Sequence, residues 1–118
     1  MSNRDRGLPD VASDDRYELQ QRYLDLVRVE LPHAARTSEG GRWCVIEDHC
    51  FMRIILDHLF NACWYEHLDK RLAAYKQLDN RQLTEAIRLA ERMLRDGPRV
   101  AESMNLQSLR WRGRITTF

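Results

Sequence analysis

Apolar residues recur at helical spacing in the first part of the chain. From residue 15 to 31, apolar side chains are spaced by four, three and one positions. This is the pattern of an amphipathic helix. The residues of this stripe are Leu19, Tyr23, Leu26 and Val27. Ser13 or Asp14 is expected to cap this helix. Pro32 ends it or starts a new turn, since proline disfavours helical geometry in the residue before it.

A second helix is predicted over residues 47–65, the most hydrophobic stretch of the chain. At about 100° per residue, its apolar side chains cover a broad surface, as in the central helix of a bundle. These side chains include Phe51, Met52, Ile55, Leu56 and Leu59. A narrow polar stripe remains on the same helix and consists of His49, Arg53, Asp57 and Asn61.

The last third of the chain predicts two more helices. Asp79 or Asn80 is a suitable N-cap for an amphipathic helix that includes Leu83–Leu94. The sequence Asp96-Gly97-Pro98 ends that helix, and Pro98 suits the first turn of a final helix over 98–111. Residues 67–77 are expected to be partly helical. The apolar run 43–46 is too short to assign from its pattern.

These elements predict an all-α fold, a single compact bundle of four or five helices. Residues 1–13 lack periodicity and contain Gly7 and Pro9, so they are expected to form a flexible N-terminal arm. The helical domain is placed at 14–113. A short C-terminal tail follows at 114–118.

Composition adds few constraints on function. The chain of 118 residues allows one domain, and its formal net charge of +1 gives no global attraction to nucleic acid or to a membrane. Of the 19 basic residues only Lys70 and Lys76 are lysine, and the arginines are spread along the whole chain. The sequence contains no glycine-rich phosphate loop, no zinc-protease motif and no nucleophile elbow.

The same composition predicts the compartment. The three cysteines form no Cys-x-x-Cys pair, and their odd number is unlike a disulfide framework. Residues 1–15 are polar and do not resemble a signal peptide. No stretch is apolar enough for a membrane span. We therefore expect a soluble cytoplasmic protein with no membrane partner.

The polar stripe on the second helix is the first candidate site. His49, Arg53 and Asp57 are four residues apart and share one face. Arg53 and Asp57 are spaced for an ion pair, and a histidine beside them suits proton transfer or anion binding. We assign no catalytic residue, and these three are the candidates. The alternative interpretation is an ordinary polar edge of a helix.

The second candidate is a collection of metal-ligand residue types around the same helix. It comprises His49, Cys50, His58, Cys63 and His67. Within the helix no two of them are three or four residues apart, so they do not share a face. We therefore predict no metal site, and we predict no cofactor.

The third candidate combines basic and aromatic residues. Arg110, Trp111, Arg112 and Arg114 follow one another closely near the C-terminus, where they suit phosphate contacts and base stacking. The alternative is that Trp111 covers the core and the arginines pair with acidic residues. Trp64 and Tyr65 belong to residue types enriched at protein interfaces. We predict these six residues as binding residues.

Three functional hypotheses follow. The leading one is a non-enzymatic domain that mediates protein–protein interaction or self-association. The alternative is a small enzyme or anionic-ligand-binding protein that uses His49, Arg53 and Asp57, which requires a pocket containing His49 and Arg53. The second alternative is nucleic-acid binding through the basic C-terminal segment.

Overall fold

The computed structural model describes residues 9–114, with side chains from Asp15 onward. Its helices are α1 (Pro9–Asp25), the π-helix η2 (Leu26–Glu30), α2 (Leu31–Thr37), α3 (Asp48–Phe60), the 3₁₀ helix η3 (Trp64–Glu66), α4 (Ala74–Gln77), α5 (Asn80–Asp96) and α6 (Pro98–Trp111). These residues contain no strand. The prediction of an all-α bundle is confirmed.

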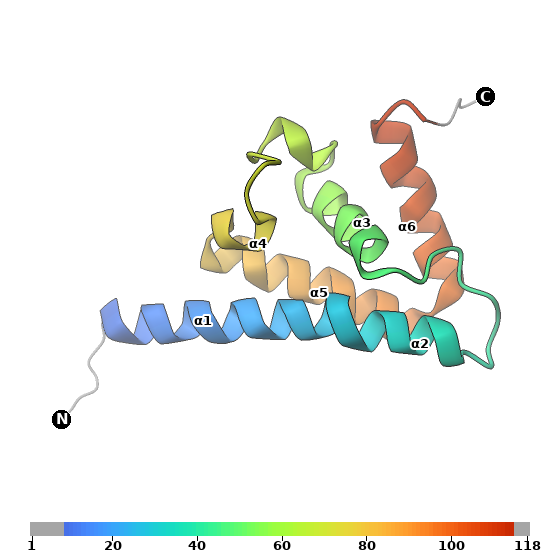
Figure 1. Cartoon of the computed structure of the whole chain (residues 1–118), viewed down its shortest axis with the longest axis horizontal. Helices are drawn as coiled ribbons and strands as arrows, with labels where there is room; N and C mark the ends of the chain where they lie inside the picture. The colour runs from blue at the N-terminus through green and yellow to red at the C-terminus, as the bar shows by residue number, and fades with distance from the viewer. Residues whose placement is uncertain (1–8, 115–118) are drawn as a thin grey trace.

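Two long helical segments form the base of the bundle (Figure 1). α1 continues through η2 into α2, and α5 lies beside it and runs in the same direction. Arg16 donates to the Lys76 carbonyl at 2.8 Å and also to the Leu78 carbonyl, which fixes the end of α4 against α1. α3 and α6 rise from this base side by side (Figure 1). None of the helices in residues 9–114 combines the length and apolar character needed to cross a bilayer.

The first helical segment is longer than predicted. It begins at Pro9 rather than near residue 15, and it continues past Pro32 to Thr37. Pro32 has no N–H and cannot bond to the carbonyl four residues before it. The helix widens there instead, and the Leu31 N–H donates to the Leu26 carbonyl five residues back. Residues 1–8 of the predicted arm and 115–118 of the predicted tail lie outside the described residues.

The helix predicted over 47–65 ends early, at Phe60. Asn61 adopts a left-handed conformation with φ of 55°, which asparagine tolerates better than most residues. The prediction that Trp64 and Tyr65 lie on this helix is therefore wrong. Both residues belong to the separate turn η3.

The last two helices follow the prediction closely. Asp79 is the N-cap of α5 and forms a reciprocal capping box with Gln82. Gly97, with φ of 89°, separates α5 from α6, which begins at Pro98 and ends at Trp111 as expected. The core lies between the base helices and the pair α3 and α6. It includes Leu26, Leu31, Phe51, Ile54, Ile55, Leu78, Leu83 and Met93.

Candidate functional site

Asp57 on α3 is fully buried, with 0% of its surface exposed. Its carboxylate accepts hydrogen bonds from Arg112 Nε at 2.7 Å and Arg112 Nη2 at 3.1 Å. The Ser108 hydroxyl donates to it at 2.7 Å, and the Trp64 backbone N–H at 2.9 Å. The charge is thus paired and its oxygens are satisfied, as a buried carboxylate requires. Asp57 therefore joins α3, η3 and the end of α6.

The predicted ion pair between Arg53 and Asp57 does not form. Arg53 Nη1 donates to the Ser108 hydroxyl at 2.7 Å, and Nη2 donates to Asn105 Oδ1 at 2.7 Å. Both acceptors are neutral and both lie on α6. Asp57 instead binds Arg112, whose side chain is only 9% exposed. This hydrogen bond raises the pKa of Arg112, although burial opposes the rise.

A cavity of about 370 Å³ lies where these groups meet. α1 and η2 supply Tyr23 and Arg28, α3 supplies His49 and Arg53 with two apolar residues, and the segment 72–75 closes another side. The lining residues are Tyr23, Arg28, His49, Met52, Arg53, Leu56, Trp64, Tyr65, Leu72, Ala73, Ala74, Tyr75 and Arg112. Among the side chains that the structure describes, those of residues 15–114, no aspartate or glutamate lines it. The wall is therefore apolar and aromatic, with three guanidinium groups.

Both tyrosines at the outer part of this wall attract cations. The Arg112 guanidinium lies 4.9 Å from the centre of the Tyr65 ring, and the Lys70 ammonium lies 5.1 Å from it. The Tyr75 ring has Arg28 at 5.9 Å and Lys76 at 6.0 Å. Such contacts favour a positive charge over an aromatic face. The two lysines of the chain and three of its arginines thus gather around one cavity.

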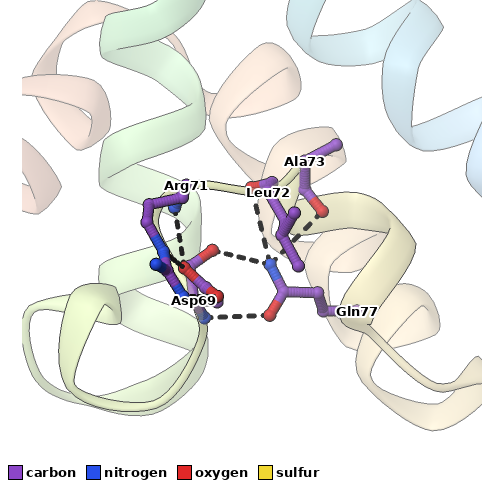
Figure 2. A network of polar contacts seen from close by, with 5 residues as sticks. All are labelled: Asp69, Arg71, Leu72, Ala73 and Gln77. Atoms are coloured by element: carbon purple, nitrogen blue, oxygen red, sulfur yellow. Dashed lines mark hydrogen bonds and ion pairs between the residues drawn. The ribbon is translucent and has the colours of Figure 1, made fainter.

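Hydrogen bonds between Asp69 and Gln77 close a segment of chain (Figure 2) that includes the cavity-lining residues 72–75. Gln77 Nε2 donates to the Asp69 carbonyl at 2.8 Å, and the Asp69 N–H donates to Gln77 Oε1 at 2.9 Å. The Asp69 carboxylate also accepts from the Arg71 backbone and guanidinium at 2.9–3.0 Å. We call residues 69–77 the strap. Because Gln77 anchors both backbone groups of Asp69, it fixes the part of the strap that lines the cavity.

Tyr23 has an unusual place in this wall. The residue is 1% exposed, and its hydroxyl is buried with no hydrogen-bond partner among the described residues. Burial raises the pKa of this hydroxyl, and the nearby charge of Arg28 opposes the rise. Arg28 belongs to the π-helix η2 that accommodates Pro32. π-helical turns inside α-helices occur frequently at functional sites.

The predicted site residues divide between the cavity and other surfaces. Five of them line the cavity: His49, Arg53, Trp64, Tyr65 and Arg112. Asp57 lies behind it and contacts its lining residues Arg112 and Trp64. Trp111 packs edge-on against His58, with ring centroids 4.9 Å apart. Arg110 and Arg114 are exposed and do not line it.

His49 stands at the edge of the cavity and not in its interior. Its side chain is 74% exposed, and Nδ1 lies 3.7 Å from Asp48 Oδ1. Glu47, Asp48 and His49 have potential ligand atoms within 4.8 Å of one another, at the surface. Cys44, Cys50 and Cys63 are free thiols. Nothing in the contacts of His49 pairs it with Arg53 or Asp57 as a proton-transfer group.

The sequence did not predict the part of the cavity wall that is formed by α1, η2 and the strap. Tyr23 was expected only as part of a core stripe, and Arg28 and the strap residues were not singled out. The available signal was Pro32, which interrupts a helical pattern without ending it. No local pattern indicates that the strap folds back onto α1 and α3.

Comparisons with known protein families, with functionally characterised proteins and with solved structures found no match to this chain.

Proposed function

We propose that this protein binds a small organic anion with an aromatic or other apolar body, in the cavity between α1, α3, η3 and the strap. The observation that carries this proposal is the combination of an apolar wall with Arg28, Arg53 and Arg112 and with no lining carboxylate among the described side chains of residues 15–114. Binding cavities for small molecules are mostly apolar, with a few polar groups that orient the ligand.

The state of each arginine supports an anionic ligand. Arg112 is neutralised by the buried Asp57. Arg53 is held in place by the neutral oxygens of Ser108 and Asn105, and Arg28 contacts the Tyr75 ring. In the described part of the chain neither Arg53 nor Arg28 has a carboxylate partner. The cavity wall thus keeps two positive charges that a ligand carboxylate or phosphate complements.

Arg53 is the residue that we assign to the anionic group of the ligand. Its two bonds to α6 orient the guanidinium, and such orientation before binding lowers the entropic cost of binding. Met52, Leu56 and Trp64 supply apolar contacts around it. A hydrogen bond to a charged group contributes about 1.5–3 kcal/mol. Loss of Arg53 is therefore expected to weaken binding by about tenfold or more.

The test uses naphthoate as the probe and naphthamide as its uncharged counterpart, with calorimetry and NMR titration of the full chain. Naphthoate is expected to bind and to shift resonances of Trp64, Tyr65 and Leu72, whereas naphthamide binds at least about tenfold more weakly. Arg53→Gln is expected to remove this preference for the acid. Arg88→Gln changes an exposed arginine that pairs with Glu85 and serves as the matched control.

Two results would contradict the proposal. One is equal affinity for the acid and the amide, since charge recognition would then be absent. The other is naphthoate binding that Arg53→Gln and Arg88→Gln reduce equally, which would indicate general charge attraction and not this cavity.

Protein–protein interaction or self-association stays a prediction, and one observation favours it. Tyr65 and Leu72 are 47% and 59% exposed, and both line the mouth of the same cavity. Exposed apolar side chains at a concave site are typical of docking surfaces. Light scattering of the purified chain tests the self-association part directly. A dimer that Leu72→Ser dissociates would support it, and a mass of 14.1 kDa at all concentrations would contradict it.

A further inference from the structure

We propose that the ligand of this cavity is a dianion, an apolar body that carries one anionic group at Arg53 and a second, separate anionic group at Arg28. This inference rests on the proposed function, because it names the class of ligand that the same cavity takes. It makes Arg28 the residue that distinguishes a diacid from a monoacid.

The first step is the position of the Arg28 guanidinium. Its central carbon lies 5.9 Å from the centre of the Tyr75 ring, and both residues line the cavity. The charge of Arg28 also acts on Tyr23, another lining residue, where it opposes the rise in pKa that burial causes. Arg28 is exposed, so a ligand can contact it directly. A positive charge therefore lies at the cavity and is accessible.

The second step is that Arg28 lacks the acidic partners of a neighbouring arginine. Arg22, on the same helical segment, binds Glu30 at 2.5 Å and Glu91 at 3.2 Å. Among the residues whose side chains the structure describes, no carboxylate pairs with Arg28, and its contact is with the Tyr75 ring. Arginine binds a carboxylate through strong charge-assisted hydrogen bonds, so Arg28 is available to an anionic group of a ligand.

The third step is the separation of the two charges. Arg28 belongs to η2, whereas Arg53 belongs to α3 and is held by two hydrogen bonds to α6. Apolar side chains from α3 and η3 line the same cavity. Arg112 adds no uncompensated charge, because the buried Asp57 neutralises it. Two charges on different elements of an apolar wall are complemented by two anionic groups on one apolar body.

The experiment compares two diacids with their half-amides by calorimetry of the full chain. Terephthalate is paired with para-carbamoylbenzoate. In the second pair the anionic groups are further apart: para-phenylenediacetate is compared with para-(carbamoylmethyl)phenylacetate. The two members of a pair have nearly the same shape, and only the diacid carries the second charge.

For the unaltered chain, at least one diacid is expected to bind about threefold to tenfold more tightly than its half-amide. This factor is smaller than the one expected at Arg53, because Arg28 is exposed and water weakens the attraction. Naphthoate in the same experiment tests the proposed function separately.

Three variants show whether the preference comes from Arg28. Arg28→Gln is expected to abolish it while leaving the affinity for the half-amide nearly unchanged. Arg28→Lys keeps the charge and is expected to retain part of the preference. Lys76→Gln is the matched control, because Lys76 lies 6.0 Å from the same Tyr75 ring but does not line the cavity. This variant is expected to keep the full preference.

The outcomes distinguish the two proposals. If neither naphthoate nor any of the benzene acids binds, the proposed function and this inference both fail. If naphthoate binds but neither diacid binds more tightly than its half-amide, the anion site at Arg53 stands and the dianion is wrong. The same conclusion follows if Arg28→Gln and Lys76→Gln reduce the preference equally, or if Arg28→Lys loses it as completely as Arg28→Gln does.

Discussion

Arg53 and Arg112 line the same cavity, but only Arg112 has its charge neutralised within the protein. Arg112 makes two hydrogen bonds to Asp57, which is fully buried. Arg53 donates to Ser108 and Asn105, which carry no charge. The two arginines are joined through Ser108, whose hydroxyl accepts from Arg53 and donates to Asp57.

Under the proposed function, this difference separates a structural arginine from one that binds the ligand. A buried carboxylate holds the charge of Arg112 inside the fold, where it closes α3 onto α6. Neutral acceptors hold Arg53 in position and leave its positive charge facing the cavity. We therefore expect changes at Asp57 or Arg112 to lower stability, and changes at Arg53 to lower affinity.

The largest expected effect is on stability at Asp57. Asp57→Ala leaves Arg112, which is almost completely buried, without its partner, and breaking a buried pair costs about 3–5 kcal/mol. Urea unfolding measures this change in the free energy of unfolding. Glu91→Gln is the matched control, because Glu91 pairs with Arg22 at 3.2 Å on the surface. Exposed pairs contribute about 0–1 kcal/mol. Similar losses in both variants would contradict the structural role of Asp57.

A smaller effect is expected at the strap. Gln77→Ala removes both hydrogen bonds to the Asp69 backbone. The wall formed by Leu72 and Ala73 then loses its anchor, and naphthoate affinity is expected to fall about threefold to tenfold. NMR titration measures it. Arg71, whose side chain is 85% exposed, is the side-chain partner of Asp69. Arg71→Ala removes this partner and is expected to leave naphthoate affinity unchanged. An equal loss in both variants would show that Gln77 does not act through the wall.

The smallest effect concerns His58 and pH. Burial lowers the pKa of His58, although its hydrogen bond to the Met104 carbonyl at 2.9 Å opposes this. The unfolded chain therefore binds this proton at higher pH than the folded protein does. The corresponding stability is present above the unfolded pKa of about 6.5 and is lost as the pH falls through the lower folded pKa.

His58→Gln keeps a hydrogen-bond donor for Met104 but does not titrate. Its free energy of unfolding is expected to fall less than that of the unaltered chain between neutral pH and mildly acidic pH. Urea unfolding at several pH values measures the difference. Parallel curves for the two proteins would show that His58 does not contribute to acid sensitivity.

The helices with clear local signals were predicted well from the sequence. α6 has the predicted bounds, because Gly97 and Pro98 mark its start and its apolar spacing is regular. The predicted end of α3 was wrong. Apolar residues continue through Trp64, but the left-handed conformation of Asn61 ends the helix before them. That turn is stabilised by Asp57, which accepts the Trp64 N–H. The hydrogen bond from the Trp64 N–H to the Asp57 carboxylate does not depend on the spacing of apolar residues, so the hydrophobic pattern gives no sign of it.

The candidate site was predicted in part. The spacing of His49, Arg53 and Asp57 predicted that they share one face of a helix. The basic and aromatic residues near the C-terminus predicted Arg112 as a binding residue. Nothing in the sequence showed that Asp57 pairs with Arg112 across 55 residues. Long-range pairing depends on how α6 packs against α3, and local spacing does not record that packing.

Arg53→Gln and Arg112→Gln, measured side by side, test the division between the two arginines most directly. Both the free energy of unfolding and naphthoate affinity are determined for each variant. We expect Arg53→Gln to lower affinity about tenfold or more with a stability loss of about 1 kcal/mol, since it loses hydrogen bonds to neutral groups only. Arg112→Gln is expected to lose about 3–5 kcal/mol of stability. Equal stability losses in the two variants, or unchanged affinity in Arg53→Gln, would contradict the assignment.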